Sequence, residues 1–125
     1  MLMLSQNPHD AYRKVQVNAR ILGSDPKDLV AICFEQVVSE LGRAIRANDA
    51  GDTGSRSDGL TRAIAAITAL EMGLDRNNPV AGALEHLYSA ARETILDCVM
   101  TFDTGALAEV RSDFAEIGAA LTAAG

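Results

Sequence analysis

The sequence predicts an all-α protein, an antiparallel up-down four-helix bundle preceded by a short N-terminal helix or arm. Two observations predict this fold. Alanine, the best helix former, is the commonest residue, and apolar residues recur at three- and four-residue steps in four separate stretches. The 125 residues suffice for one compact domain. We therefore expect a single domain over residues 1–125, with an arm over 1–22 and a bundle over 25–123.

The first long helix is expected over residues 26–48. Ser24 or Asp25 can accept hydrogen bonds from its free amide groups, and a proline suits its first turn, where the missing N–H group costs nothing. Turn-forming residues fill the stretch 49–55 and end this helix. The apolar stripe then resumes and predicts a second helix over residues 56–74.

Asn77-Asn78-Pro79 stops the second helix and is expected to cap the third, whose apolar residues run from Val80 to Phe102. After the turn at 103–105, a similar series from Leu107 to Leu121 predicts the fourth helix. Short connections between long helices of similar length favour antiparallel neighbours. Residues 9–22 show a shorter and more broken apolar pattern, which we interpret as a short helix or an extended arm.

The charge balance argues against a nucleic-acid partner. The chain has 11 Lys and Arg against 17 Asp and Glu, a formal net charge of −6. Its only lysines are Lys14 and Lys27, whereas binding a phosphate backbone requires clustered cations. Residues 1–49 are balanced, with six basic and six acidic side chains, so the excess acid lies in residues 50–125.

The sequence favours the cytoplasm. The apolar residues 1–4 are too few for the core of a signal peptide, and no later stretch approaches the ~18 apolar residues of a membrane helix. We therefore expect no membrane insertion. Cys33 and Cys98 lie far apart inside apolar patterns, which suits two reduced thiols in the cytosol.

No catalytic, cofactor or metal site is predicted, and we expect a protein that is not an enzyme. The Glu-x-x-His pairs of di-metal bundles are absent around His9 and His86. Neither cysteine has a histidine nearby in the sequence to activate it. The glycines of the first helix connection match no phosphate-binding motif, and the nine arginines are scattered along the chain.

Several polar and apolar markers resemble those of one protein family, the flagellin-specific export chaperones, or FliS family. The stretch from Ala11 to Val17 resembles that family's A-Y-x-x-V-x-V, and the stretch from Ile21 to Leu29 resembles its V-x-T-A-S-P-x-x-L. Further similarities, in order along the chain, are Ile32-Cys33-Phe34-Glu35, Gly51-Asp52, Gly73-Leu74-Asp75, Leu84 with Leu87-Tyr88, and Asp103 with Leu107, Glu109 and Val110. The resemblance covers about residues 11–122.

The resemblance implies a bundle without enzymatic activity that holds the C-terminal segment of flagellin in the cytosol before export. That segment is amphipathic and polymerises by helix packing, so a chaperone needs an apolar groove to mask it. We hypothesise that exposed members of the first long helix and its neighbours line this groove. Its proposed residues are Ile21, Leu22, Leu29, Val30, Ile32, Cys33, Phe34, Val37, Leu87 and Tyr88.

Within this set, Val30 and Phe34 are expected beside the main apolar stripe, and Tyr12 and Val15 are assigned to an arm that shields the groove. Two other functions stay open. The bundle could be an interaction or regulatory module for another flagellar or secretion client, or a small helical enzyme with an arginine-lined site. A homodimer is also conceivable, because arm and groove could exchange between two chains.

Overall fold

The computed structural model describes the backbone of residues 26–124 and the side chains of residues 27–123. This part of the chain forms four helices and contains no strand. The helices are α2 (Pro26–Asp49), α3 (Thr53–Met72), α4 (Ala81–Met100) and α5 (Thr104–Ala124). The all-α prediction is therefore confirmed. The expected N-terminal arm lies outside the described residues.

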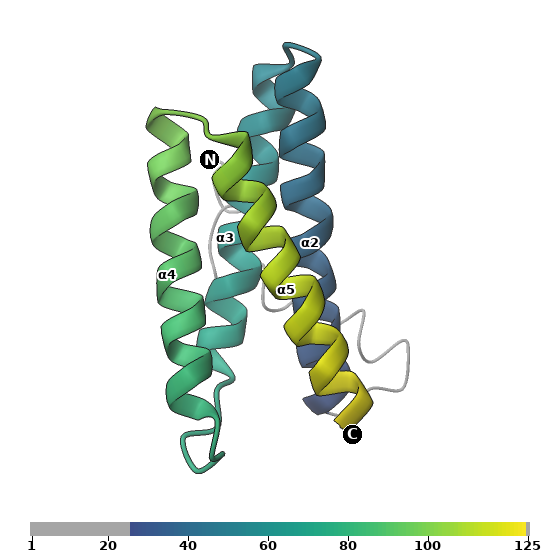
Figure 1. Ribbon diagram of the computed structural model, residues 1–125, viewed down its shortest axis with the longest axis vertical. Coiled ribbons are helices and arrows are strands. Elements are labelled where there is room, and N and C mark those ends of the chain that lie inside the picture. The colour runs from purple at the N-terminus through teal and green to yellow at the C-terminus, as the bar shows by residue number, and fades with distance from the viewer. Residues whose placement is uncertain (1–25, 125) are drawn as a thin grey trace, which may run out of the picture.

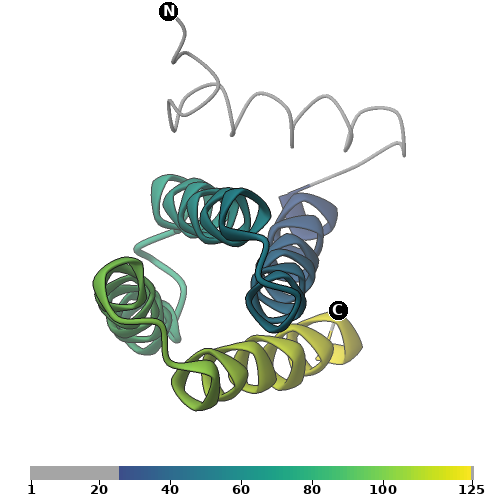
Figure 2. The same cartoon turned by 90° about the horizontal axis from the view of Figure 1, so that it is seen from above.

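The four helices run alternately up and down (Figure 1). Seen from above, they stand around a common centre in chain order (Figure 2). Helix α2 packs most extensively against α3 and also against α5, and α4 packs against α3 and α5. Helices α2 and α4 therefore face each other across the bundle, and only long side chains can join them.

The core consists of side chains that come from all four helices. Val37 and Leu41 of α2, Ile67 of α3, Ile95 of α4 and Leu107 of α5 are among the fully buried ones. These residues follow the three- and four-residue spacing of an apolar helix face, so the stripes seen in the sequence are the faces that pack together.

Helices α2 and α3 approach each other closely at Gly59. A Cβ atom added to Gly59 would lie 2.8 Å from the backbone oxygen of Glu40 and 3.1 Å from the Cβ atom of Ala44. Ala44 is itself fully buried. The small side chains at both positions let the two backbones come together, and this contact fixes the distance between α2 and α3.

Helix α3 begins three residues earlier than the sequence predicts. Asp52 precedes it, and its carboxylate accepts a hydrogen bond of 3.0 Å from the amide of Ser55. That bond satisfies one of the free amide groups of the first turn and starts the helix at Thr53. The helix ends at Met72, where the amide of Gly73 donates a 3.1 Å hydrogen bond to the carbonyl of Ala69 and the amide of Leu74 donates a 3.3 Å bond to the carbonyl of Glu71.

The expected cap of α4 is wrong. The residue before the helix is Val80, which offers no side-chain cap. Asn78 instead forms a turn ahead of the helix, because its side-chain oxygen accepts a 2.9 Å hydrogen bond from the amide of Val80. Asparagine commonly makes such a local bond in a turn. The helix then begins at Ala81.

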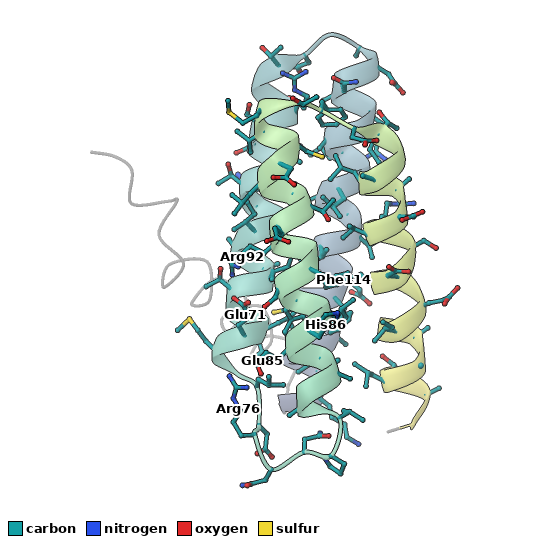
Figure 3. All side chains as sticks on the ribbon, turned by 60° about the vertical axis from the view of Figure 1, so that its left-hand side comes forward. Glu71, Arg76, Glu85, His86, Arg92 and Phe114 are labelled. Carbon is teal, nitrogen blue, oxygen red and sulfur yellow. The ribbon has the colours of Figure 1, made fainter. Side chains whose placement is uncertain are left out.

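Ion pairs link neighbouring helices at their edges. Arg43 of α2 bridges Glu40 of its own helix at 3.1 Å and Asp58 of α3 at 2.7 Å. The hydrogen bond from Arg43 lowers the pKa of Asp58 below its usual range. On the other side of α3, Arg92 of α4 pairs with Glu71 (Figure 3). These pairs flank the core and set which helix edges meet.

The close contact between α2 and α3 gives a prediction about stability. Replacing Gly59 with alanine should lower the free energy of unfolding by about 1–3 kcal/mol, because the new methyl group forces the two backbones apart. Urea denaturation measures the change. The matched control is Gly82→Ala in the first turn of α4, where a Cβ atom meets nothing within 4 Å. It should leave stability unchanged or raise it by up to about 1 kcal/mol. Equal effects of the two substitutions would contradict the account.

Candidate functional site

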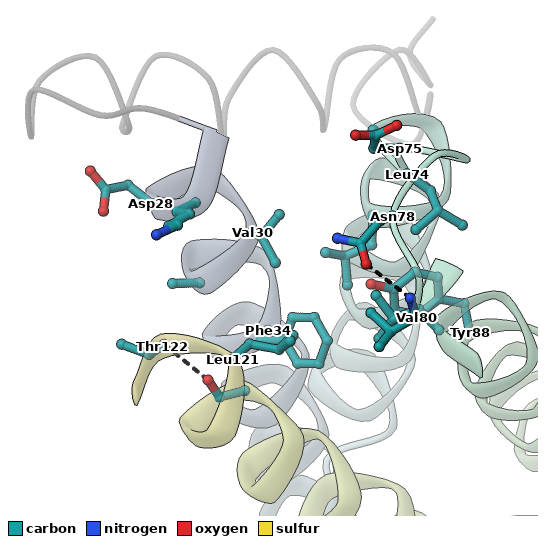
Figure 4. Close-up of a pocket in the computed structure, with 16 residues that line it drawn as sticks. Asp28, Val30, Phe34, Leu74, Asp75, Asn78, Val80, Tyr88, Leu121 and Thr122 are labelled. Atoms are coloured by element: carbon teal, nitrogen blue, oxygen red, sulfur yellow. Dashed lines mark hydrogen bonds between the residues drawn. The ribbon is translucent and has the colours of Figure 1, made fainter. Parts of the chain in front are cut away.

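An apolar cleft opens at one end of the bundle, where α2 and α4 begin and α3 and α5 end. Its volume is about 620 Å³. All four helices contribute to its walls (Figure 4). The larger apolar side chains that line it are Val30, Phe34, Leu70, Leu74, Val80, Leu84, Tyr88 and Leu121. The cleft therefore presents apolar surface to solvent at a place where the bundle core would otherwise continue.

The floor of the cleft is an aromatic cluster. The Phe34 ring lies 5.1 Å from that of Phe114 and 6.1 Å from that of Tyr88, measured between centroids. All three side chains are almost completely buried. Gly118 of α5 faces this cluster, and a Cβ atom there would lie only 3.2 Å from the Cβ atom of Phe34. The floor is thus densely packed and forms a firm base for anything that enters the cleft.

The walls above this floor are only partly covered. Val30 of α2, Leu84 of α4 and Leu121 of α5 are half-buried side chains that pack against the core and also line the cleft. Half-buried apolar residues around a hollow gain contacts when another apolar surface covers them. These three residues are the ones best placed to touch a bound partner.

Polar groups surround the opening and shape one side of it. Lys27 and Asp28 line the cleft from α2, and Asp75 and Asn78 line it from the loop between α3 and α4. Asp75 accepts a 2.9 Å hydrogen bond from the amide of Asn77, which holds the loop in a turn. The mouth thus combines an apolar interior with a mixed polar rim, the usual composition of a protein-binding surface.

The same loop is tied to α4 by an ion pair. The Nη1 atom of Arg76 lies 2.7 Å from the Oε1 atom of Glu85, and Figure 3 shows both side chains beside the loop. This pair holds the pKa of the Glu85 carboxyl below its usual range. Both side chains are more than half exposed, so the pair contributes little to stability and chiefly limits where the loop can move.

Comparison with known proteins identifies the family. Residues 8–124 match the family described as "Flagellar protein FliS". The chain belongs to the FliS family. One relative, the "Flagellar secretion chaperone FliS" of Salmonella typhimurium (strain LT2), is 28% identical over 113 residues, which cover 88% of this chain and 84% of that protein.

Three of the predicted groove residues line the cleft of this FliS-family protein, namely Val30, Phe34 and Tyr88. Phe34 is expected at an exposed position beside the main stripe, yet only 2% of it is exposed, because Phe114 and Tyr88 enclose its ring. It contributes to the floor of the cleft from within the core.

The other predicted residues lie elsewhere. Cys33 and Val37 are buried in the core and do not line the cleft, so the expectation that they are exposed is wrong. Leu29, Ile32 and Leu87 are half-buried against the core and outside the cleft lining. The remaining four, Tyr12, Val15, Ile21 and Leu22, lie outside the described residues.

Sequence reasoning missed several lining residues of the FliS-family cleft, above all Leu84 and Leu121. Both belong to apolar stripes that the sequence shows. The signal that could have found them is their position along the helix. In an up-down bundle, the start of α4 and the end of α5 meet at the same end as the start of α2.

Within residues 26–124, no group of three or more His, Cys, Asp and Glu side chains could hold a metal ion. No arginine lines the cleft. Burial raises the pKa of the Cys33 thiol to about 12, which keeps it protonated and unreactive. In the same part of the chain, no helix is long and apolar enough to cross a bilayer.

The burial of Cys33 predicts slow thiol modification. In a Cys98→Ala variant, which leaves Cys33 as the only cysteine, iodoacetamide at about pH 8.5 should label the folded protein about 100-fold more slowly than the urea-unfolded protein. Mass spectrometry over time gives both rates, and circular dichroism verifies that the variant is folded. Labelling of the folded protein at the rate of a free thiol would contradict the burial of Cys33 and its raised pKa.

Proposed function

We propose that this FliS-family protein is a flagellar secretion chaperone that works in the cytosol. It binds the C-terminal amphipathic segment of flagellin and prevents premature polymerisation before export. The observation that supports this function best is the apolar cleft at one end of the bundle in a chain of this family. The name of the Salmonella relative supports the chaperone role.

The apolar lining of the cleft suits side chains from one face of a helix. An amphipathic helix presents apolar side chains at positions i, i+3 and i+4, which lie close together on one face. One such group enters the cleft between Val30, Leu84 and Leu121, and the polar residues of the client helix remain at the rim.

The proposed role requires no chemical step. The client segment is disordered when free, so folding it on the chaperone costs conformational entropy that buried apolar area must offset. The affinity reflects only the difference between the free energy gained from apolar burial and the entropy cost of folding the client, so binding is reversible. This suits a chaperone that has to release its client for export.

The groove residues divide into two groups in this proposal. Val30 belongs to the wall that the client touches, Phe34 and Tyr88 form the buried floor beneath it, and Cys33 and Val37 hold this surface in place from the core. Leu29, Ile32 and Leu87 support its edges. Ile21 and Leu22, with Tyr12 and Val15 of the arm, keep the roles proposed from the sequence.

Binding of a flagellin C-terminal peptide tests this function directly. Isothermal titration calorimetry at several temperatures should show binding with a clearly negative heat capacity change, because apolar surface is buried. Circular dichroism should show a gain of helix in the peptide on binding. Absence of both signals would contradict the proposal. Binding of another flagellar export protein in its place would favour the alternative of a module for a different client.

The place of binding is tested by a charge introduced into the cleft wall. Val30→Asp should weaken binding of the flagellin peptide about tenfold or more, because the client would bury an unpaired carboxylate. The matched control is Val99→Asp at the far end of α4, on a side chain that is 60% exposed. That variant should bind as the unchanged protein does. If both variants lose binding equally, or neither does, the client does not use this cleft.

A further inference from the structure

A second apolar surface lies at the C-terminal end of α4. Three large apolar side chains there are exposed to solvent, with exposed fractions of 49% for Leu96, 60% for Val99 and 87% for Met100. We call these three residues the α4 patch. Single exposed apolar residues are common on protein surfaces, but three adjacent ones at the end of one helix form a contiguous surface, and such surfaces mark interaction sites.

The α4 patch is bordered by negative charge. Glu93 and Asp97 are exposed and share a helix face with Leu96 and Met100, because the four positions are three or four residues apart. Among the described residues, neither carboxylate takes part in an ion pair or a hydrogen bond. By contrast, Glu85 near the start of the same helix is paired with Arg76.

A basic group at this end of the bundle is already engaged. Arg56 of α3 stacks on the ring of Phe102, which follows α4, with its guanidinium carbon 5.4 Å from the ring centroid. It also donates a 2.8 Å hydrogen bond to the side chain of Asn48. The carboxylates of Glu93 and Asp97 are therefore available to pair with a cation from outside the described part of the chain.

The α4 patch is separate from the cleft. Val80 lines the cleft just before α4 begins, and Met100 is the last residue of that helix. Twenty residues of helix correspond to about 30 Å along its axis. The two ends of α4 lie at opposite ends of the bundle (Figure 1). A client helix seated in the cleft thus leaves the α4 patch open.

We propose that the α4 patch docks an amphipathic helix of another protein, one that carries Lys or Arg beside its apolar stripe. Its apolar face covers Leu96, Val99 and Met100, and its cations pair with Glu93 and Asp97. The negative charge of Glu93 and Asp97 favours this basic helix over two other occupants. An anionic membrane surface is repelled by these carboxylates, and a second copy of this chain would bring the same carboxylates together in a protein of net charge −6.

The size of the α4 patch sets the strength of this docking. Stable interfaces cover about 800 Å² on each partner, far more than three side chains provide. The interaction is therefore weak and depends on salt, because part of its free energy comes from exposed charge pairs.

The experiment uses two fluorescent helical peptides of about 18 residues, one with leucine and lysine on opposite faces and one with glutamate in place of lysine. Fluorescence anisotropy with the full-length protein should show binding of the lysine peptide, weakening as salt rises from about 0.05 M to about 0.5 M. Because either peptide would also place its leucine face in the apolar cleft, both are measured on the full-length Val30→Asp variant, in which the cleft wall carries a charge, and there the glutamate peptide should not bind. Met100→Ser and the double variant Glu93→Gln, Asp97→Asn should each weaken binding about tenfold.

Two controls make the result specific to the α4 patch. Met72→Ser removes a methionine that is 57% exposed at the end of α3, and it should leave binding of the lysine peptide unchanged. Met100→Ser should leave binding of the flagellin peptide unchanged, which separates this surface from the cleft. The proposal is overturned if the Met100 and carboxylate variants bind the lysine peptide normally, if Met72→Ser weakens binding as much as they do, or if both peptides bind equally.

Discussion

The aromatic cluster of Phe34, Tyr88 and Phe114 is the contact on which the rest of the structure depends. It contains three of the five aromatic residues in the chain, which has three Phe, two Tyr and no Trp. Its members come from α2, α4 and α5, so it joins the two helices that face each other across the bundle. Two of these rings, Phe34 and Tyr88, also line the cleft, and Phe114 packs beneath them. Burial also raises the pKa of the Tyr88 hydroxyl to about 12, which keeps it neutral. Stability and a binding surface thus arise from one set of side chains.

The two ends of the bundle differ in chemistry because apolar surface and charge are combined differently. At the cleft, apolar side chains line a hollow whose rim carries Lys27 as well as Asp28 and Asp75. At the far end of α4, apolar side chains lie on a convex helix surface beside Glu93 and Asp97, whose carboxylates have no ion-pair partner within the described residues. A hollow with mixed charge suits the apolar face of a client helix, whereas a convex acidic surface selects for a basic partner. Two of the eleven acidic side chains in residues 50–125 thus border the α4 patch.

Periodicity predicts the helices well because each buries one continuous stripe, and the expected first helix over residues 26–48 differs from α2 by a single residue at its end. Helix starts are harder to predict, since several residues can supply the first hydrogen bond. Asp52 does so for α3, and no side chain does so for α4.

The residues of the cleft are predicted only in part, because their position depends on packing between helices. The apolar stripe includes Cys33 and Val37 and leaves Phe34 beside it. Which of these side chains reaches a hollow depends on where the core ends, and that is set by packing between helices distant in sequence.

In the proposed function, a client helix lies against the aromatic floor of the cleft. Nuclear Overhauser effects between leucine methyl groups of a bound flagellin C-terminal peptide and the ring protons of Tyr88 and Phe34 test it most directly, because they arise only between protons in close contact. We expect such effects, together with amide shift changes concentrated around Val30, Leu84 and Leu121. Contacts from the peptide confined to other surfaces, with an unchanged environment around the Tyr88 ring, would contradict the account.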